Sequence, residues 1–212
     1  MTVLIAGFAP FPGAPFNPSA DLVAALSQAP QRPGRAVVTL PVSWDESWPT
    51  LQRAIEESGA RRVVLFGLHM SAERLRIELV ARNRRELGRE DAAGRFPAGP
   101  SILEGPATHA CRLPFSELAL LLRRHKLDFE WSTNAGGYLC NDTLFKLAHH
   151  ADRLGVELFG FVHLPLSDER VADMIASGEE VPAVFNSISA EALLALADDL
   201  FALLSANEPA TA

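Results

Sequence analysis

The stretch Ser132–Asn141 reads STNAGGYLCN and places Cys140, one of two cysteines in the chain, just after a pair of glycines. Gly136 and Gly137 permit a sharp turn, and the helical spacing of apolar residues begins at Leu139. We therefore expect Cys140 at the start of a helix, where unpaired N–H groups and the positive end of the helix dipole favour the nucleophilic thiolate and could stabilise an oxyanion. The spacing is equally compatible with a structural thiol, because free cysteine is among the most commonly buried residues.

A nucleophilic cysteine needs a base, and His163 has the most suitable position among the six histidines. It follows the apolar run Leu158–Val162, so we expect it at the C-terminal end of a buried strand, where α/β proteins place their sites. His149 and His150 lie roughly 14 Å from Cys140 along the expected helix, which is too far for direct contact. A core histidine that hydrogen-bonds to the backbone is the alternative for His163.

Glu78 is the candidate for the third group, which would orient the base. It lies within Ile77–Ala81, an apolar, strand-like segment. A buried carboxylate needs a partner, because its desolvation is costly. If the alternation of the strand instead points Glu78 to solvent, the residue has no such role. Cys111 is the weaker nucleophile candidate, since it lies beside Arg112 and Leu113 without a comparable turn.

Length and composition indicate one globular domain without a nucleic-acid or membrane partner. The chain has 212 residues, of which 48% are hydrophobic and 21% charged, enough for a sizeable core. Its formal charge of −7 argues against nucleic acid and anionic membranes, because both attract basic patches. No apolar run approaches the ~20 residues that span a bilayer, and the N-terminus lacks the basic region of a signal peptide. Two cysteines do not make a disulfide framework, so we expect a cytoplasmic protein.

Short β-branched runs alternate with helical patterns, which favours a single-domain α/β/α sandwich with a largely parallel, mixed and twisted sheet. We expect this domain to span residues 1–205 and residues 206–212 to form a flexible tail. The expected strands are Val3–Ile5, Ala36–Leu40, Arg62–Phe66, Ile77–Val80, Phe129–Ser132 and Val156–Val162. The expected helices are Pro18–Ser27, Trp44–Ser58, Phe115–His125, Cys140–Leu154, Asp168–Ser177 and Ala190–Leu204.

Two segments between these elements have an unusual composition. Residues 88–106 are rich in Gly, Pro and Ala and cannot form a regular element throughout. A loop of this length is a lid, a binding loop or a mobile segment. The arginine-rich run 82–89, which Glu86 interrupts, is interpreted as a solvated surface.

Five separate blocks of the sequence resemble the pyroglutamyl peptidase I (pyrrolidone-carboxylate peptidase) family of cysteine peptidases, in the family's order and with its spacings. One block alone would be a weak signal, whereas five that cover nearly the whole chain are a specific one. The blocks are Gly7–Gly13 with Asn17–Ser19, Gly67 with Glu78, Val80, Ala81 and Asn83, Ile102 with Glu104–Ala107 and Leu113–Pro114, Ser132–Gly136 with Leu139–Asn141, and Phe161–Pro165.

The resemblance implies an enzyme that removes an N-terminal pyroglutamate from small peptides by hydrolysing the amide bond after it. It implies that Cys140 is the nucleophile, that His163 is the general base and then the acid, and that Glu78 orients the imidazole. A pyroglutamyl thioester would be the intermediate. The family needs no metal or organic cofactor, which agrees with the lack of zinc-ligand spacing in the sequence. Its members are often oligomeric, so we expect a homo-oligomer.

The resemblance also assigns a substrate pocket, in which Phe8 and Phe11 align with residues that form its apolar walls and Asn17 with a nearby polar position. Two segments depart from the family. Leu68–Ala72 replaces a Gln, small residues and an Arg, and Glu86–Glu90 replaces an Asp-Ala-Arg-Ile-Pro sequence. Two alternatives therefore stay open: a thiol amidase that acts on another small acyl group or cyclic amide, and a non-catalytic relative that keeps the fold.

Overall fold

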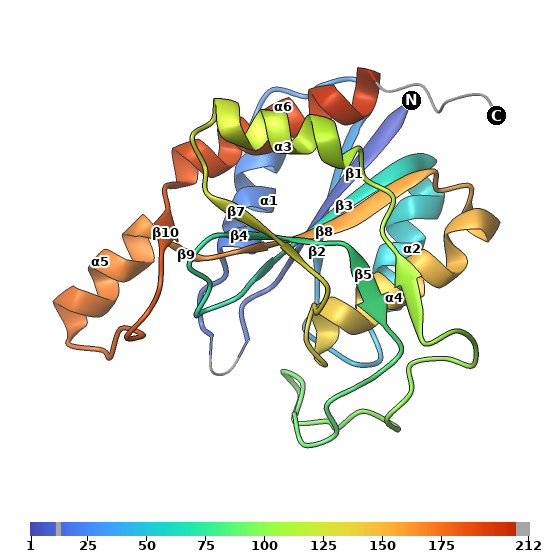
Figure 1. Ribbon diagram of the computed structural model, residues 1–212, viewed down its shortest axis with the longest axis horizontal. Coiled ribbons are helices and arrows are strands. Elements are labelled where there is room, and N and C mark those ends of the chain that lie inside the picture. Colours follow the sequence, from blue (N-terminus) through green and yellow to red (C-terminus); the bar gives the residue numbers. More distant parts are fainter. Residues whose placement is uncertain (12–13, 207–212) are drawn as a thin grey trace.

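The computed structural model describes residues 1–11 and 14–206, and its centre is a six-stranded sheet with the order β2-β1-β3-β8-β4-β7 (Figure 1). Neighbouring strands run parallel, except that β4 and β8 are antiparallel. The predicted mixed, largely parallel sheet is thereby confirmed. Of the tail expected at residues 206–212, only Ala206 lies within the described residues. The strands are β1 (Thr2–Phe8), β2 (Arg35–Leu40), β3 (Ala60–Leu68), β4 (Leu75–Glu78), β7 (Phe129–Ser132) and β8 (Leu158–Leu164).

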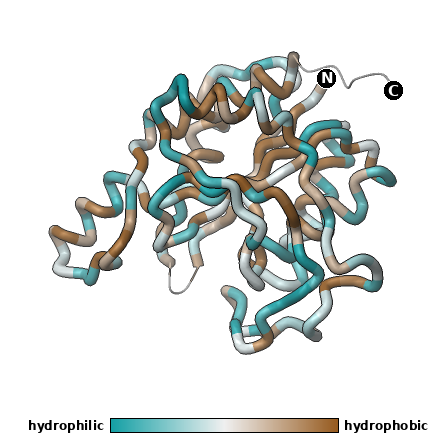
Figure 2. The backbone as a smooth tube through the Cα atoms, viewed as in Figure 1, coloured by the Kyte–Doolittle hydropathy of each residue, from teal (hydrophilic) through white to brown (hydrophobic). Residues whose placement is uncertain are grey.

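Helices cover both faces of the sheet, and each face has its own hydrophobic core (Figure 1). Helices α2 and α4 pack on one face, and α1, α3 and α6 pack on the other. Strand β1 supplies alternate residues to the two cores, Leu4 and Ala6 to the first and Val3 and Ile5 to the second. Hydrophobic residues accordingly run along the central strands, as Figure 2 shows. The helices are α1 (Pro18–Gln28), α2 (Ser47–Ser58), α3 (Phe115–Arg124), α4 (Leu139–Leu154), α5 (Asp168–Ser177) and α6 (Ala190–Ala206).

Of the helices that the structure describes, none combines the length and the hydropathy that a membrane crossing requires. The six predicted helices are all confirmed to within a few residues at their ends. Short strands escaped prediction, because two or three residues carry no recognisable alternation. These strands are β6 (Thr108–Ala110), β9 (Leu166–Ser167) and β10 (Ser187–Ile188).

The expected strand Ile77–Val80 is wrong in one respect, because the chain changes sheets inside it. Strand β4 ends at Glu78, and the following strand β5 pairs antiparallel with β6 in a separate two-stranded sheet. Leu79 lies at the change: its N–H donates to the Ser132 carbonyl at the end of β7, and its own carbonyl accepts from the Cys111 N–H. Hydrogen-bond partners from distant parts of the chain therefore end the strand. The bounds of β5 are Val80–Arg82.

The C-terminal end of β1 is held against the start of α1 by two side chains. Asn17 is the N-cap residue of α1, and its Oδ1 accepts from the Ser19 N–H at 3.1 Å and from the Ser19 hydroxyl at 2.8 Å. The Ser19 Oγ accepts in turn from the Phe8 N–H at 2.9 Å. This close approach requires glycine at position 7, since a Cβ on Gly7 would lie 2.2 Å from the Ser19 carbonyl oxygen.

Replacing Gly7 by alanine should lower the free energy of unfolding by about 1–3 kcal/mol, because the new methyl group forces β1 and α1 apart. Gly99→Ala is the matched control: no described atom lies within 4 Å of a Cβ built on Gly99, so the change should stay within about 0.5 kcal/mol. Urea unfolding followed by circular dichroism measures both. Equal stabilities of the two variants would contradict the close approach.

Candidate active site

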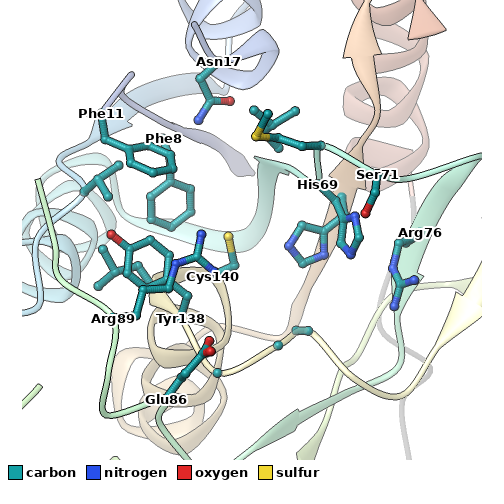
Figure 3. Close-up of a pocket in the computed structure, with 18 of the residues that line it drawn as sticks. Phe8, Phe11, Asn17, His69, Ser71, Arg76, Glu86, Arg89, Tyr138 and Cys140 are labelled. Carbon is teal, nitrogen blue, oxygen red and sulfur yellow. The ribbon is translucent and has the colours of Figure 1, made fainter. Parts of the chain in front are cut away.

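A cavity of about 470 Å³ opens at the C-terminal ends of the central strands (Figure 3). Phe8 ends β1, Leu68 ends β3, and His163 is the penultimate residue of β8; all three line the cavity. Cys140, the second residue of α4, lines the same cavity. The prediction of Cys140 at a helix start and of His163 at a strand end is therefore confirmed.

His163 and Glu78 form a buried, hydrogen-bonded pair. The Nδ1–H of His163 donates to Oε1 of Glu78 at 2.8 Å, and the two residues are 3% and 0% exposed. Because β4 and β8 are antiparallel, Arg76 lies opposite His163 and Glu78 lies opposite Phe161, so the imidazole and the carboxylate share one face of the sheet. The alternative in which Glu78 faces solvent is wrong.

The turn before α4 presents the thiol to the cavity. Gly136 has a φ of +84°, a conformation that favours glycine. Cys140 then falls in the first helical turn, whose N–H groups have no intrahelical partners. Gly67 at the end of β3 leaves room for the sulfur, because a Cβ there would lie 3.1 Å from Sγ of Cys140 and 2.7 Å from Cζ of Phe161. The thiol therefore lies over β3, beside the imidazole of β8.

The imidazole of His163 is held in its charged form. Burial by itself lowers the pKa of His163, but the hydrogen bond and charge of Cys140, together with those of Glu78, outweigh burial and raise that pKa to about 9. The imidazolium lies between the sulfur and the carboxylate. The site thus holds a thiol and a proton donor side by side.

Cys111 differs from Cys140 in burial and in charge. Its side chain is outside the cavity lining and only 6% exposed. Burial, together with the negative charge of Glu78, raises the pKa of Cys111 to about 12. The thiol is therefore protonated at neutral pH, and reagents in solution have little access to it.

The three residues that the resemblance assigns to a substrate pocket, Phe8, Phe11 and Asn17, all line the cavity (Figure 3). The ring of Phe8 packs on Phe161 with centroids 6.2 Å apart, and the ring of Phe11 packs on Tyr138 at 6.1 Å. Phe8, Phe11 and Tyr138 together form an aromatic wall on one side of the thiol. Asn17 Oδ1 is engaged in capping α1, so its amide nitrogen is the group left for a ligand.

Sequence analysis assigned no individual role to several cavity residues, among them Tyr138 and His69. The Tyr138 hydroxyl donates to the Glu90 carbonyl at 2.8 Å, which fixes its ring in the aromatic wall. The ring of His69 lies 5.7 Å from that of His163 and nearly perpendicular to it. Burial lowers the pKa of His69, and the positive charges of His163 and Arg76 lower it further. The position of His69 directly after β3 was the available signal, because residues at strand C-termini line α/β sites.

The long connection between β5 and β6 forms part of the cavity rim. It contains no regular element over residues 83–107, a range that includes the segment 88–106 for which none was predicted throughout. Glu86 and Arg89 line the cavity, and the Arg89 guanidinium lies 4.0 Å from the centroid of the Tyr138 ring. The segments 68–72 and 86–90, which were expected to depart from the family, therefore both contribute residues to the cavity.

The interpretation of residues 82–89 as a solvated surface is wrong at Arg85. The Arg85 side chain is 11% exposed, and its Nε donates at 2.7 Å to Oδ1 of Asp142, which is 1% exposed. Asn141 adds a second tie: its amide donates to the carbonyls of Arg82 and Arg84. The rim is thus bound to the first turn of α4, directly after the thiol.

Within residues 1–11 and 14–206, no three His, Cys, Asp or Glu side chains are grouped so as to hold a metal ion. The sulfur and the imidazole are instead engaged with each other and with Glu78.

A thiol reagent at neutral pH should modify Cys140 and leave Cys111 unmodified, because only Cys140 lines the cavity beside an imidazolium. Iodoacetamide labelling followed by peptide mass spectrometry measures the two sites separately. The Cys140→Ser variant is the control and should take up no label while folded. Labelling of both thiols at similar rates in the native protein would contradict the difference in their surroundings.

Comparison with known proteins agrees with this geometry. The sequence model of the family described as "Pyroglutamyl peptidase" matches residues 1–199. Pyrrolidone-carboxylate peptidases of Yersinia pestis and Yersinia pseudotuberculosis are 32% identical over 174 residues, which is 81% of this chain and 81% of each relative.

Solved structures show the same relationship. The pyrrolidone carboxyl peptidase of Fervidobacterium islandicum is 27% identical, with a TM-score of 0.86 over 97% of this chain and 98% of that one. The pyroglutamyl peptidase I of Bacillus amyloliquefaciens shares the fold, with a TM-score of 0.84 at 23% identity over 97% of each chain. The chain belongs to the pyroglutamyl peptidase family.

Proposed function

We propose that the protein is a cysteine peptidase that hydrolyses the amide bond after an N-terminal pyroglutamyl residue. The observation that carries this proposal is the buried pair of Glu78 and His163 beside Cys140, at a cavity with an aromatic wall. Family membership supports the choice of substrate. We assign the role of nucleophile to Cys140, that of base and acid to His163, and that of orienting carboxylate to Glu78.

The reaction proceeds in two stages. The Cys140 thiolate attacks the pyroglutamyl carbonyl carbon and forms a C–S bond, and the N–H groups at the start of α4 stabilise the oxyanion. On collapse the C–N bond breaks, and His163 gives its proton to the departing nitrogen, which leaves as the amine of the shortened peptide. His163 then takes a proton from water, whose oxygen attacks the thioester carbonyl. When the second tetrahedral intermediate collapses, the C–S bond breaks and the thiolate returns, while His163 keeps the proton that it took from water. Pyroglutamate leaves and loses its own carboxyl proton to solution.

The aromatic wall suits the pyroglutamyl ring. A lactam has no charge on its nitrogen, so apolar rings and a few polar groups are sufficient to bind it. Phe8 and Phe11 supply the rings, and Asn17 supplies one polar group. Leu68 lines the same cavity, and an apolar residue there favours the rival reading of a thiol amidase with a different acyl group. Cleavage of pyroglutamyl amides but not of other acyl amides would support the pyroglutamyl peptidase, and the opposite result would support the thiol amidase.

Four further properties belong to this proposal. We expect a single peptidase domain over residues 1–205, a homo-oligomer, a cytoplasmic location, and turnover without a metal or organic cofactor. Nucleic acid and membranes are not expected as partners, given the net charge of −7. Size-exclusion chromatography with light scattering measures the oligomer, and assays in the presence of a chelator measure any need for metal.

Cys140→Ser should lower turnover of a fluorogenic pyroglutamyl amide by at least about 10³-fold, because loss of a catalytic nucleophile leaves only binding and oxyanion contacts. Cys111→Ser is the matched control and should retain activity within about twofold, since that thiol lies outside the cavity. Both variants need an unchanged urea midpoint. Wild-type rates in a folded Cys140→Ser sample would refute the assignment of the nucleophile.

The pH profile of kcat/KM should fall on its alkaline side with an apparent pKa of about 9, where His163 loses the proton that the leaving group needs. Glu78→Gln keeps a hydrogen-bond acceptor but removes the charge that raises this pKa, so the alkaline limb should move to lower pH. Glu130→Gln is the control, because Glu130 pairs with Arg76 at 2.9 Å rather than with His163. An unmoved limb in Glu78→Gln, or equal shifts in both variants, would contradict the pairing.

A further inference from the structure

The two sides of the cavity differ in chemical character. The aromatic wall of Phe8, Phe11 and Tyr138 lies on one side of Cys140, and His69 lies with Ser71 and Arg76 on the other (Figure 3). We call this second side the polar half. An acyl ring that occupies the aromatic wall places its carbonyl carbon at the sulfur, so the rest of a peptide substrate has to leave through the polar half.

His69 is the side chain of the polar half that is ready to bind a ligand. Its Nδ1 is buried without a hydrogen-bond partner among the described residues, whereas the ring as a whole lines the cavity. A proton on Nδ1 would therefore be a buried donor without an acceptor, and the neutral ring is better protonated on Nε2. Nε2–H is then a donor that faces the cavity.

Arg76 is less available than His69, although it also lines the polar half. Its NH1 group donates to Glu130 at 2.9 Å and its NH2 group donates to the Ser132 hydroxyl at 2.9 Å. These bonds hold the guanidinium against the strands. The charge of Arg76 and that of His163 also keep the neighbouring imidazole of His69 neutral, because a third cation there would be repelled. A neutral donor suits a peptide carbonyl without competing for the thiolate.

We infer that the polar half is the leaving-group subsite, and that Nε2–H of His69 donates a hydrogen bond to the backbone carbonyl of the residue that follows the scissile bond. This inference rests on the proposed function and deepens it by naming the residue that recognises the leaving group. His69 is a specificity residue in this role, since it contacts the leaving group and takes no part in bond breaking. The segment 68–72, which contains His69 and was expected to depart from the family, would then contribute to recognition of the leaving group.

Two substrates distinguish a contact with the leaving group from a general effect of His69 on catalysis. Pyroglutamyl-alanine amide carries the backbone carbonyl, and pyroglutamyl β-naphthylamide has no carbonyl in its leaving group. Loss of the donor in His69→Ala should lower kcat/KM about 10-fold for the peptide amide, the effect of one lost hydrogen bond in a partly buried site. The naphthylamide should change by less than about twofold.

Two substitutions that introduce a side-chain amide test which ring nitrogen of His69 makes the contact. The Gln side chain in His69→Gln places an N–H group near the Nε2 position and should restore most of the activity towards the peptide amide. His69→Asn reaches only the Nδ1 position and should behave like alanine. Phe8→Ala is the control for the acyl side and should lower kcat/KM for both substrates by the same factor. If His69→Ala does not fold, the comparison of the Gln and Asn variants decides the question.

The outcomes are distinct. A wild-type protein that cleaves neither substrate refutes the proposed function, and the inference falls with it. A wild-type protein that cleaves both, with equal losses in His69→Ala for the two substrates or no loss for either, refutes the leaving-group contact and leaves the proposed function intact. Equal activity of the Gln and Asn variants on the peptide amide would also overturn it, because the contact would then not involve Nε2.

Discussion

The carboxylate of Glu78, fully buried in the sheet, is the constraint on which the rest of the site depends. A charge in this position is stable only with a partner, because removal of its hydration is costly. His163 is that partner, at 2.8 Å. The observed register of β4 beside β8 brings residues 78 and 163 to one face of the sheet. Arg76, on the same face, adds a second positive charge, with its Nε 3.7 Å from Oε1 of Glu78.

The surrounding structure divides the work between rigid and variable parts. Strand ends and the first turn of α4 place the thiol, the imidazole and the carboxylate, and these elements are anchored in two hydrophobic cores. The loops after β3 and β5 supply further cavity residues, among them His69 and Arg89. Residues on loops around a rigid centre can adjust specificity without moving the groups that do the chemistry.

The sequence was sufficient for the parts of the site that local pattern controls. Cys140 follows a glycine turn and begins a helix, and His163 ends an apolar strand, so both could be placed from spacing alone. The orientation of Glu78 could not, because it depends on a register with a strand 85 positions away. Arg85 was misjudged for the same reason, since its partner Asp142 lies 57 positions along the chain. His69 received no role of its own because its neighbours in sequence say nothing of its neighbours in space.

The position of β8 between β3 and β4 ties reactivity to the completion of folding. A growing chain contains Glu78 and Cys140 before residues 158–164 exist, and during that time the sulfur has no imidazolium of β8 beside it. Pairings between distant segments form late and slowly. Incomplete or misfolded copies therefore carry an ordinary cysteine, which is a poor nucleophile and a slow target for oxidants. The thiol becomes reactive only when β8 is in place between β3 and β4. By then the cavity that controls access to the thiol has formed around it.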